Sequence, residues 1–104
     1  MSNENAVLQI ATIYVNFCKA HDGLTFLSAV PSPNDSCTVK IQVGDNIEVT
    51  GEQNPLEVNM ELTRAWTDLV EIPRAIEIAR QNKIWILSVQ QVDSNGHLHS
   101  VANF

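Results

Sequence analysis

The sequence predicts an α+β fold: an antiparallel sheet of about five to six strands, an N-terminal helix, and a second helix before a C-terminal hairpin. Three patterns carry this prediction. Apolar residues recur at helical spacing over 5–21, alternate with polar residues over 37–43, and form a dense run over 83–89 that leads to an Asn-Gly pair at 95–96. The 104 residues are few enough for a single α+β domain, 1–104.

Charge is spread unevenly along the chain. Six Lys and Arg residues stand against twelve Asp and Glu residues, and the net charge of −6 lies entirely within residues 1–62. Phosphate backbones are bound by clustered Lys and Arg, so nucleic acid is not an expected partner. A basic protein partner is compatible with this charge.

The first residues do not resemble an export signal. A signal peptide begins with positive charge, whereas Glu4 is the one charged residue among the first five. The apolar run over 6–18 is interrupted by polar residues and is shorter than the about 20 residues that span a bilayer. We therefore expect a cytoplasmic protein without membrane contact, in which Cys18 and Cys37 are free thiols.

The first predicted element is a helix over 5–21, ended by Gly23 at a position that favours a left-handed residue. Its apolar residues sweep an arc of roughly 220°, about twice what a helix lying on one sheet needs. Two explanations are open. The helix is sandwiched between two layers of its own chain, or it pairs with its copy across a dimer axis.

The next stretch contains the clearest strand pattern. Residues 24–30 are compatible with a strand or a short helix, and 31–36 have the composition of a loop. Strict alternation over 37–43 predicts a strand with one buried face.

Two further strands are predicted after a turn at 44–46, one over 47–49 and one over 56–62. With the preceding strand they form an antiparallel meander. Its outer face carries mostly acidic side chains, namely Lys40, Glu48, Glu57 and Glu61.

A second helix is predicted within 68–82. Asp68 and Glu71 have the spacing of a capping box, and Pro73 is tolerated only in a first turn, so the regular helix begins close to it. Trp66 lies in the preceding connector, where it is either a core residue or an interface anchor.

The apolar run over 83–89 is bulky on both alternating faces, which predicts a strand covered above and below, with Trp85 in the core. Asn95-Gly96 predicts a two-residue hairpin loop after it. The resulting register pairs Ser94 with His97, Val92 with His99, Val89 with Ala102 and Leu87 with Phe104.

No pattern indicates catalysis, and no residue is predicted to be catalytic. We expect a non-catalytic protein-interaction module of the adaptor, chaperone or inhibitor/immunity type, assembled as a homodimer. This expectation rests on the one-sided charge and on the wide apolar arc of the first helix. The predicted interaction face holds Glu48, Glu57 and Glu61.

The alternative is a small-ligand-binding or enzymatic domain with a pocket between the first helix and the sheet. Its predicted lining is Tyr14, Cys18, His21, Trp66 and His99. Each glycine is explained by a turn, so no phosphate-binding loop and no cofactor is predicted.

One set of residue types could bind a metal ion. Cys18 and His21 have a Cys-x-x-His spacing, and His97 and His99 a His-x-His spacing, so the four could converge if the hairpin packed against the first helix. Each residue also has an ordinary structural explanation, and no metal site is predicted.

Overall fold

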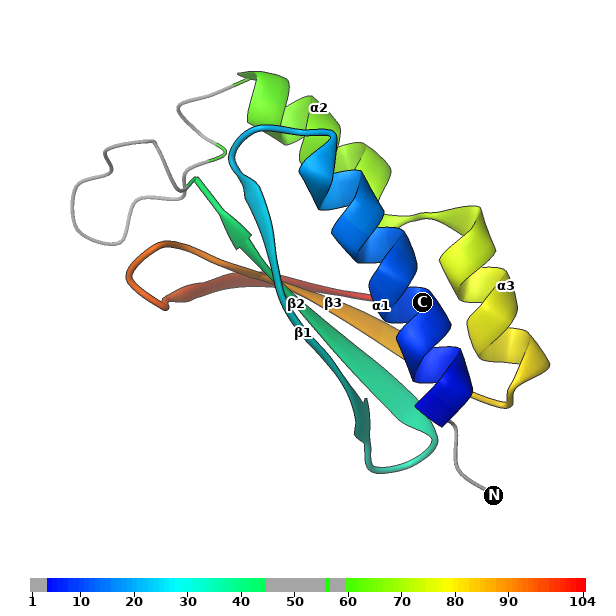
Figure 1. Cartoon of the computed structure of the whole chain (residues 1–104). Helices are drawn as coiled ribbons and strands as arrows, with labels where there is room; N and C mark the ends of the chain where they lie inside the picture. Colours follow the sequence, from blue (N-terminus) through cyan, green and yellow to red (C-terminus); the bar gives the residue numbers. More distant parts are fainter. Residues whose placement is uncertain (1–3, 45–55, 57–59) are drawn as a thin grey trace.

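The computed structural model describes residues 4–44, 56 and 60–104, and in these residues three helices lie on one face of a four-stranded sheet (Figure 1). This arrangement confirms the α+β class, the N-terminal helix and a second helix before the final hairpin. The elements in chain order are α1 (Glu4–Lys19), β1 (Leu24–Ser32), β2 (Ser36–Val43), α2 (Met60–Val70), α3 (Pro73–Gln81), β3 (Ile86–Val92) and β4 (Leu98–Asn103).

The sheet is mixed. Its strands lie in the order β1-β2-β3-β4, and both hairpins, β1–β2 and β3–β4, are antiparallel. β2 and β3 are parallel, because the chain crosses over through α2 and α3 between them. The prediction of a purely antiparallel sheet with more strands is therefore wrong.

Residues 24–30 belong to strand β1. Its pairing with β2 shifts register between Phe26 and Ser28, which leaves Leu27 as a bulge, and Pro31 lies near the end of the strand. A bulge and a proline both weaken the outer edge of a strand as a template for further strands. The β1 edge of the sheet is thus protected.

The strand predicted over 56–62 is wrong at its end, because α2 begins at Met60. The buried residues of α2 have helical spacing over a longer stretch than the alternation that suggested a strand. They are Leu62, Ala65, Trp66 and Leu69. The strand predicted over 47–49 lies outside the described residues, as do Glu48 and Glu57.

Two helices replace the one predicted within 68–82. Asp68 lies inside α2, so the predicted capping box is wrong. α3 begins with Pro73 at its first turn, after Ile72 as a cap without a side-chain hydrogen bond. Pro73 therefore separates α2, which ends at Val70, from α3, which begins at Pro73 itself.

α1 lies on the sheet beside α3 and contacts both β1 and α3, so the predicted sandwich between two layers is wrong. Ile10 and Tyr14 are fully buried, whereas Leu8 is 64% exposed. The wide apolar arc is therefore largely covered without a second copy, and it no longer supports a dimer formed through this helix. All helices in the described ranges fall short of the length and apolar character that a membrane crossing requires.

β3 places one face in the core, where Leu87 and Val89 are fully buried. Two predicted pairs are confirmed, since Val89 lies opposite Ala102, and Leu87 and Phe104 exchange two backbone hydrogen bonds of 2.8 and 2.9 Å. The other two are wrong, because Val92 lies opposite Leu98 rather than His99, and His97 pairs with Asp93 rather than with Ser94. On the opposite face Ile86 is 43% exposed, so the prediction of a strand covered on both sides is wrong at its start.

Trp85 is 55% exposed, and the prediction of a core position is wrong. Lys83 has a left-handed backbone, with φ of 60°, and this bend turns the chain before the strand. Ile84 then takes the buried position, and Trp85 is left at the surface.

The β3–β4 loop has three residues rather than the predicted two. The Asp93 N–H donates to the His97 carbonyl, and the Gly96 N–H donates to the Asp93 carbonyl, both at 3.0 Å. Gly96 has φ of 84°, which makes the loop a turn followed by a left-handed glycine.

Candidate functional site

The face of the sheet opposite the helices, which we call the open face, carries rows of side chains aligned by the strand pairing. One row runs through Val30, Thr38, Ser88 and Asn103, and the next through Ser28, Lys40, Gln90 and Val101. Lys40 is the one charged member of these two rows. The open face thus combines aliphatic side chains with uncharged polar ones.

Large aliphatic side chains of the open face are strongly exposed. The exposed fractions are 48% for Val30, 43% for Ile86, 44% for Val101 and 55% for Leu98. Single exposed aliphatic residues are ordinary, but several on one face of a small domain are typical of an interaction surface. The open face is therefore the first component of the candidate site.

β4 forms the edge of the sheet beside this surface. In an antiparallel ladder, hydrogen-bonded pairs alternate with pairs whose backbone groups point outward. Because Leu87 and Phe104 are a hydrogen-bonded pair, Val101 and Asn103 direct their N–H and C=O groups away from β3. From Ser100 to Asn103, β4 has no bulge and no proline, whereas β1 has both. The register shift of the β3–β4 pairing falls between Gln91 and Val92, before this stretch.

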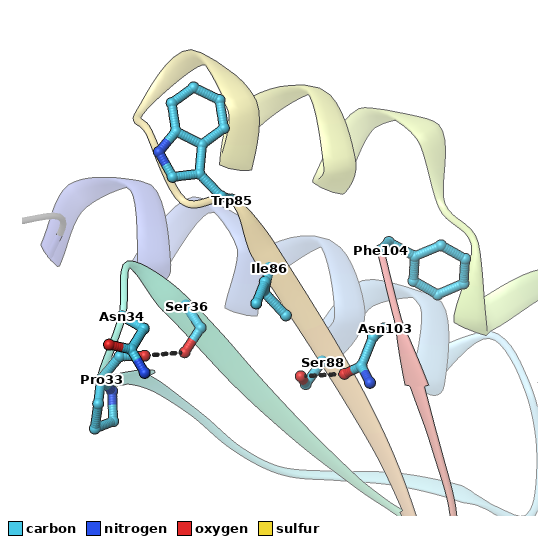
Figure 2. A pocket seen from close by; sticks show the side chains of 8 residues that line it. All are labelled: Pro33, Asn34, Ser36, Trp85, Ile86, Ser88, Asn103 and Phe104. Atoms are coloured by element: carbon cyan, nitrogen blue, oxygen red, sulfur yellow. Dashed lines mark hydrogen bonds between the residues drawn. The ribbon is translucent and has the colours of Figure 1, made fainter.

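A cavity of about 430 Å³ lies where the β1–β2 turn, the start of β3 and the end of β4 meet (Figure 2). None of its lining side chains is charged. They are Pro33, Asn34, Ser36, Trp85, Ile86, Ser88, Asn103 and Phe104.

Two hydrogen bonds organise the polar groups of this cavity (Figure 2). The Ser88 hydroxyl donates to Asn103 Oδ1 at 2.5 Å, and the Ser36 hydroxyl donates to the Pro33 carbonyl at 2.7 Å. The first bond occupies the amide oxygen of Asn103 and leaves its NH₂ group as a donor. The indole N–H of Trp85 is a second donor.

The backbone holds Trp85 in place at the cavity. Its N–H donates to the carbonyl of Asp35 in the β1–β2 turn at 2.8 Å. Arg80 from α3 donates through Nη1 to the carbonyl of Ile84 at 2.9 Å. The exposed indole is thus carried by a fixed backbone that links α3, β3 and the β1–β2 turn.

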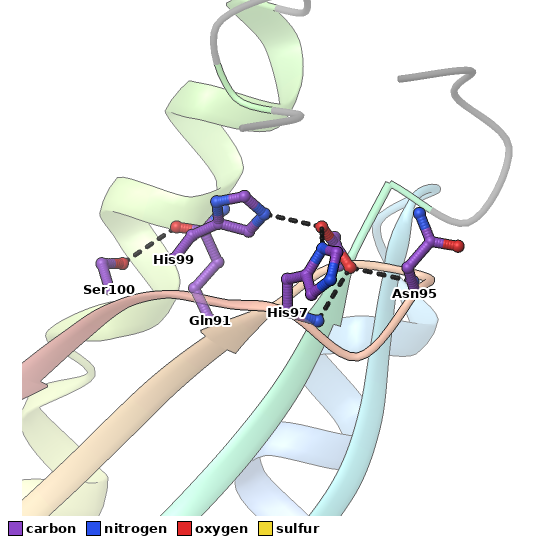
Figure 3. A network of polar contacts seen from close by, with 6 residues as sticks. Gln91, Asn95, His97, His99 and Ser100 are labelled. Carbon is purple, nitrogen blue, oxygen red and sulfur yellow. Dashed lines mark hydrogen bonds and ion pairs between the residues drawn. The ribbon is translucent and has the colours of Figure 1, made fainter. Parts of the chain in front are cut away.

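The buried carboxylate of Asp93 follows β3 at its other end, and Figure 3 labels the residues around it. Asp93 Oδ1 accepts hydrogen bonds from the backbone N–H groups of Asn95 and His97, at 2.8 and 3.0 Å. Asp93 Oδ2 lies 2.7 Å from His99 Nε2 and 3.5 Å from His97 Nδ1. The carboxylate therefore closes the hairpin loop and fixes one imidazole.

These contacts set the charge state of Asp93. Burial acts to raise the pKa of its carboxyl group, but the hydrogen bonds from His99, His97 and Asn95 outweigh burial and lower the pKa. Carboxylate–imidazole pairs also orient bases in enzymes. Here the neighbouring Ser100 hydroxyl donates to Gln91 Oε1 at 2.9 Å instead, so the geometry assigns this cluster to the hairpin (Figure 3).

The structure distributes the predicted pocket residues over separate places. Tyr14 and Trp66 are buried in the core between helices and sheet. Cys18 lines a cavity of about 260 Å³ beside β1, and His21 lines another of about 260 Å³ between the end of α1 and α2. His99 contacts Asp93 at the β3–β4 hairpin.

The residues considered for a metal ion also separate. His21 follows α1, where its Nδ1 lies 2.9 Å from the Phe17 carbonyl and its ring stacks on that of Phe17 at 4.3 Å. His97 and His99 belong to the hairpin. Within the residues that the structure describes, no three His, Cys, Asp or Glu side chains are grouped as a metal site.

Cys37 lies in the core, where burial raises the pKa of its thiol to about 11. A thiol with this pKa stays protonated at neutral pH and is a weak nucleophile. Of the acidic residues predicted to form an interaction face, Glu61 is described, and it is exposed in the first turn of α2. A carboxylate there stabilises the positive end of the helix dipole.

Sequence reasoning did not find Trp85, Val101 or Asn103 as functional candidates. The signal for Val101 was present, because alternation over the last strand places it opposite the core face. Trp85 had no such signal, since its exposure follows from the left-handed backbone at Lys83.

Comparison of the chain with models of protein families, with curated proteins and with solved structures finds no match in any of the three.

Proposed function

We propose that this protein is a non-catalytic interaction module of the adaptor, chaperone or inhibitor type, and that it assembles as a homodimer through the β4 edge and the open face. The observation that supports this proposal is an edge strand that is uninterrupted from Ser100 to Asn103 and that carries the exposed Val101 on the open face. The net charge of the chain is −6, which makes a basic protein a suitable further partner.

The geometry of β4 favours a second copy as the occupant of its edge. Two identical edge strands pair antiparallel about a two-fold axis, so each copy presents the same surface to the other. If the two-fold axis passes between the two Val101 residues, the outward N–H and C=O groups of each Val101 form hydrogen bonds with those of the other copy. The two valine side chains then lie together on the open face.

The remaining pairs in this register are also compatible. Ser100 lies opposite Ala102 of the other copy, which places small side chains on the helix-bearing face. β4 carries no Asp, Glu, Lys or Arg, so two copies of an acidic chain approach at an edge without like-charge repulsion. The paired strands extend the two sheets into one.

Light scattering coupled to size-exclusion chromatography tests this proposal. We expect the wild-type protein at high micromolar concentration to have a mass near twice that of the 11.5 kDa chain. Val101→Lys places two like charges opposite each other at the axis, and lysine at an edge opposes strand addition. This variant should dissociate at concentrations roughly tenfold or more above those that dissociate the wild type.

Leu8→Lys is the matched control. Leu8 is an exposed aliphatic residue of α1, on the helical side of the molecule, so its replacement adds the same charge away from β4. This variant should remain a dimer. A wild-type monomer at high micromolar concentration, or equal weakening by both substitutions, would contradict the proposal.

A further inference from the structure

We infer that Asn95 is a site of spontaneous deamidation, and that the hydrogen bonds of Asp93 hold the β3–β4 loop closed against this reaction. The inference goes beyond the proposed function and does not depend on it. It concerns the tip of the hairpin, which neither the β4 edge nor the open face includes.

The pair Asn95-Gly96 supplies both reacting groups. The backbone nitrogen of Gly96 attacks Cγ of Asn95, so that an N–Cγ bond forms, the bond from Cγ to the side-chain nitrogen breaks, and ammonia leaves with the proton of the Gly96 nitrogen. Water then opens the five-membered succinimide ring to give aspartate or isoaspartate. Glycine hinders this attack least because it has no Cβ.

The loop exposes the reacting side chain. Asn95 and Gly96 are both exposed at the tip of the hairpin. In Figure 3 the side chain of Asn95 points away from the rings of His97 and His99. Water therefore has access to the Asn95 amide, and the packing of the core does not shield it.

The backbone on both sides of Asn95 is held by one residue. The Asn95 N–H donates to Asp93 Oδ1 at 2.8 Å, and the Gly96 N–H donates to the Asp93 carbonyl at 3.0 Å. The Gly96 nitrogen must lose its proton to attack, and in the closed loop this proton is engaged in the second bond. Ring closure also requires rotation of the peptide group between Asn95 and Gly96, which the two bonds oppose.

The loop must therefore open before Asn95 reacts. The observed rate is then the rate of the unfolded sequence multiplied by the fraction of molecules in which the loop is open. Asp93 keeps this fraction small because its own side chain is anchored. It is buried, it also accepts the His97 N–H at 3.0 Å, and its Oδ2 lies 2.7 Å from His99 Nε2.

The reaction changes the loop in which it occurs. Isoaspartate adds one carbon atom to the main chain at position 95, and both products carry a carboxylate two residues from that of Asp93. The longer loop and the like charge both oppose the hydrogen bonds that had closed it. Deamidation at Asn95 is thus a lasting mark of an earlier opening of the hairpin.

Peptide-mapping mass spectrometry of the full chain tests this inference. The wild-type protein is incubated at neutral pH in native buffer and, at the same pH, in enough guanidinium chloride to unfold it. We expect conversion of Asn95 to aspartate and isoaspartate in both solutions, roughly tenfold or more slowly in native buffer. Equal rates in the two solutions, or no conversion in the unfolded chain, would overturn the inference.

Substitution of Asp93 tests the role assigned to it. Asp93→Ala removes the acceptor of two loop N–H groups and should deamidate at Asn95 several times faster than the wild type in native buffer. Ser36→Ala is the matched control, since it removes the hydroxyl that donates to the Pro33 carbonyl at 2.7 Å in the β1–β2 turn, and its rate should equal that of the wild type. A folded Asp93→Ala protein that reacts as slowly as the wild type, or equal acceleration by Ser36→Ala, contradicts the inference.

Amide hydrogen exchange at Gly96 provides a readout that needs no variant. Exchange of this N–H and deamidation of Asn95 require the same opening, so both should be slowed by similar factors in the native protein. Rapid exchange of the Gly96 N–H together with slow deamidation would show that its hydrogen bond does not protect Asn95, and would overturn the inference.

Discussion

The hydroxyl group of Tyr14 lowers the stability of the fold that contains it. Its side chain is fully buried, and its hydroxyl has no hydrogen-bond partner among the described residues. Burial and the nearby Cys37 both raise the pKa of the phenol. The ring fills the space between α1 and the sheet, whereas the hydroxyl loses its hydration without compensation.

Removal of this hydroxyl should stabilise the protein. Tyr14→Phe keeps the ring and its packing, and we expect the free energy of unfolding to rise by about 1 kcal/mol. Urea denaturation of both proteins measures the difference, with an unchanged m-value as evidence that the unfolding transition is comparable. A loss of more than about 1 kcal/mol would show that the hydroxyl has a stabilising partner.

At the residue scale, sequence reasoning succeeded where periodicity decides burial. Alternation put Leu87 and Val89 on one face of their strand, with Phe104 and Ala102 opposite them, and the structure confirms these two pairs. It failed for Trp85, because hydrophobicity predicts burial but does not reveal a left-handed backbone at a lysine. That one backbone angle exposes the residue on which the cavity depends.

The β3–β4 hairpin is the element in which charge and turn geometry act together. Asp93 accepts two backbone N–H groups of the loop, and His99 contacts its second oxygen. The lowered pKa of its carboxyl means that the folded protein binds a proton at Asp93 less readily than the unfolded chain does. The ionised carboxylate therefore stabilises the fold.

Asp93→Asn should destabilise the hairpin in a pH-dependent manner. At neutral pH we expect a loss on the order of 1 kcal/mol, because the amide replaces one acceptor oxygen with a donor. The contribution of Asp93 is fully present above the unfolded pKa of about 4 and is lost as the pH falls through the lower folded value. Urea denaturation across this range should show the gap between wild type and variant closing in acid; a gap independent of pH would contradict the account.

At the element scale, long periodic segments were predictable and short ones were not. The first helix and the strand over 37–43 are confirmed, since each pattern extends over several repeats. The alternation over 56–62 was too short to compete with the helical spacing of Leu62, Ala65, Trp66 and Leu69. The three-residue loop depends on the Asp93 side chain, a contact that Asn95-Gly96 alone does not specify.

The whole molecule is a sheet with unequal faces and unequal edges. α1, α2 and α3 lie on one face, and the other carries exposed aliphatic residues (Figure 1). The β1 edge is interrupted by the bulge at Leu27 and by Pro31, while β4 is uninterrupted from Ser100 to Asn103. This asymmetry is the reason why we propose association at the β4 edge.

The sequence predicted a homodimer for a different reason from the one proposed here. The wide apolar arc of α1 suggested a helix-mediated dimer, but α3 and β1 of the same chain cover most of that arc. Periodicity measures how much of a helix is apolar and does not identify what covers it. The candidate interface at β4 became visible only once the strand order placed that strand at an edge.

Amide hydrogen exchange along β4, followed by NMR at several protein concentrations, tests the central claim most directly. The Ala102 N–H points toward β3 and should be protected at every concentration. The Val101 and Asn103 N–H groups point outward, so they should become protected only at concentrations where the dimer forms. Rapid exchange of both amides at high micromolar concentration, alongside a protected Ala102, would show that the β4 edge remains unpaired and would contradict the account.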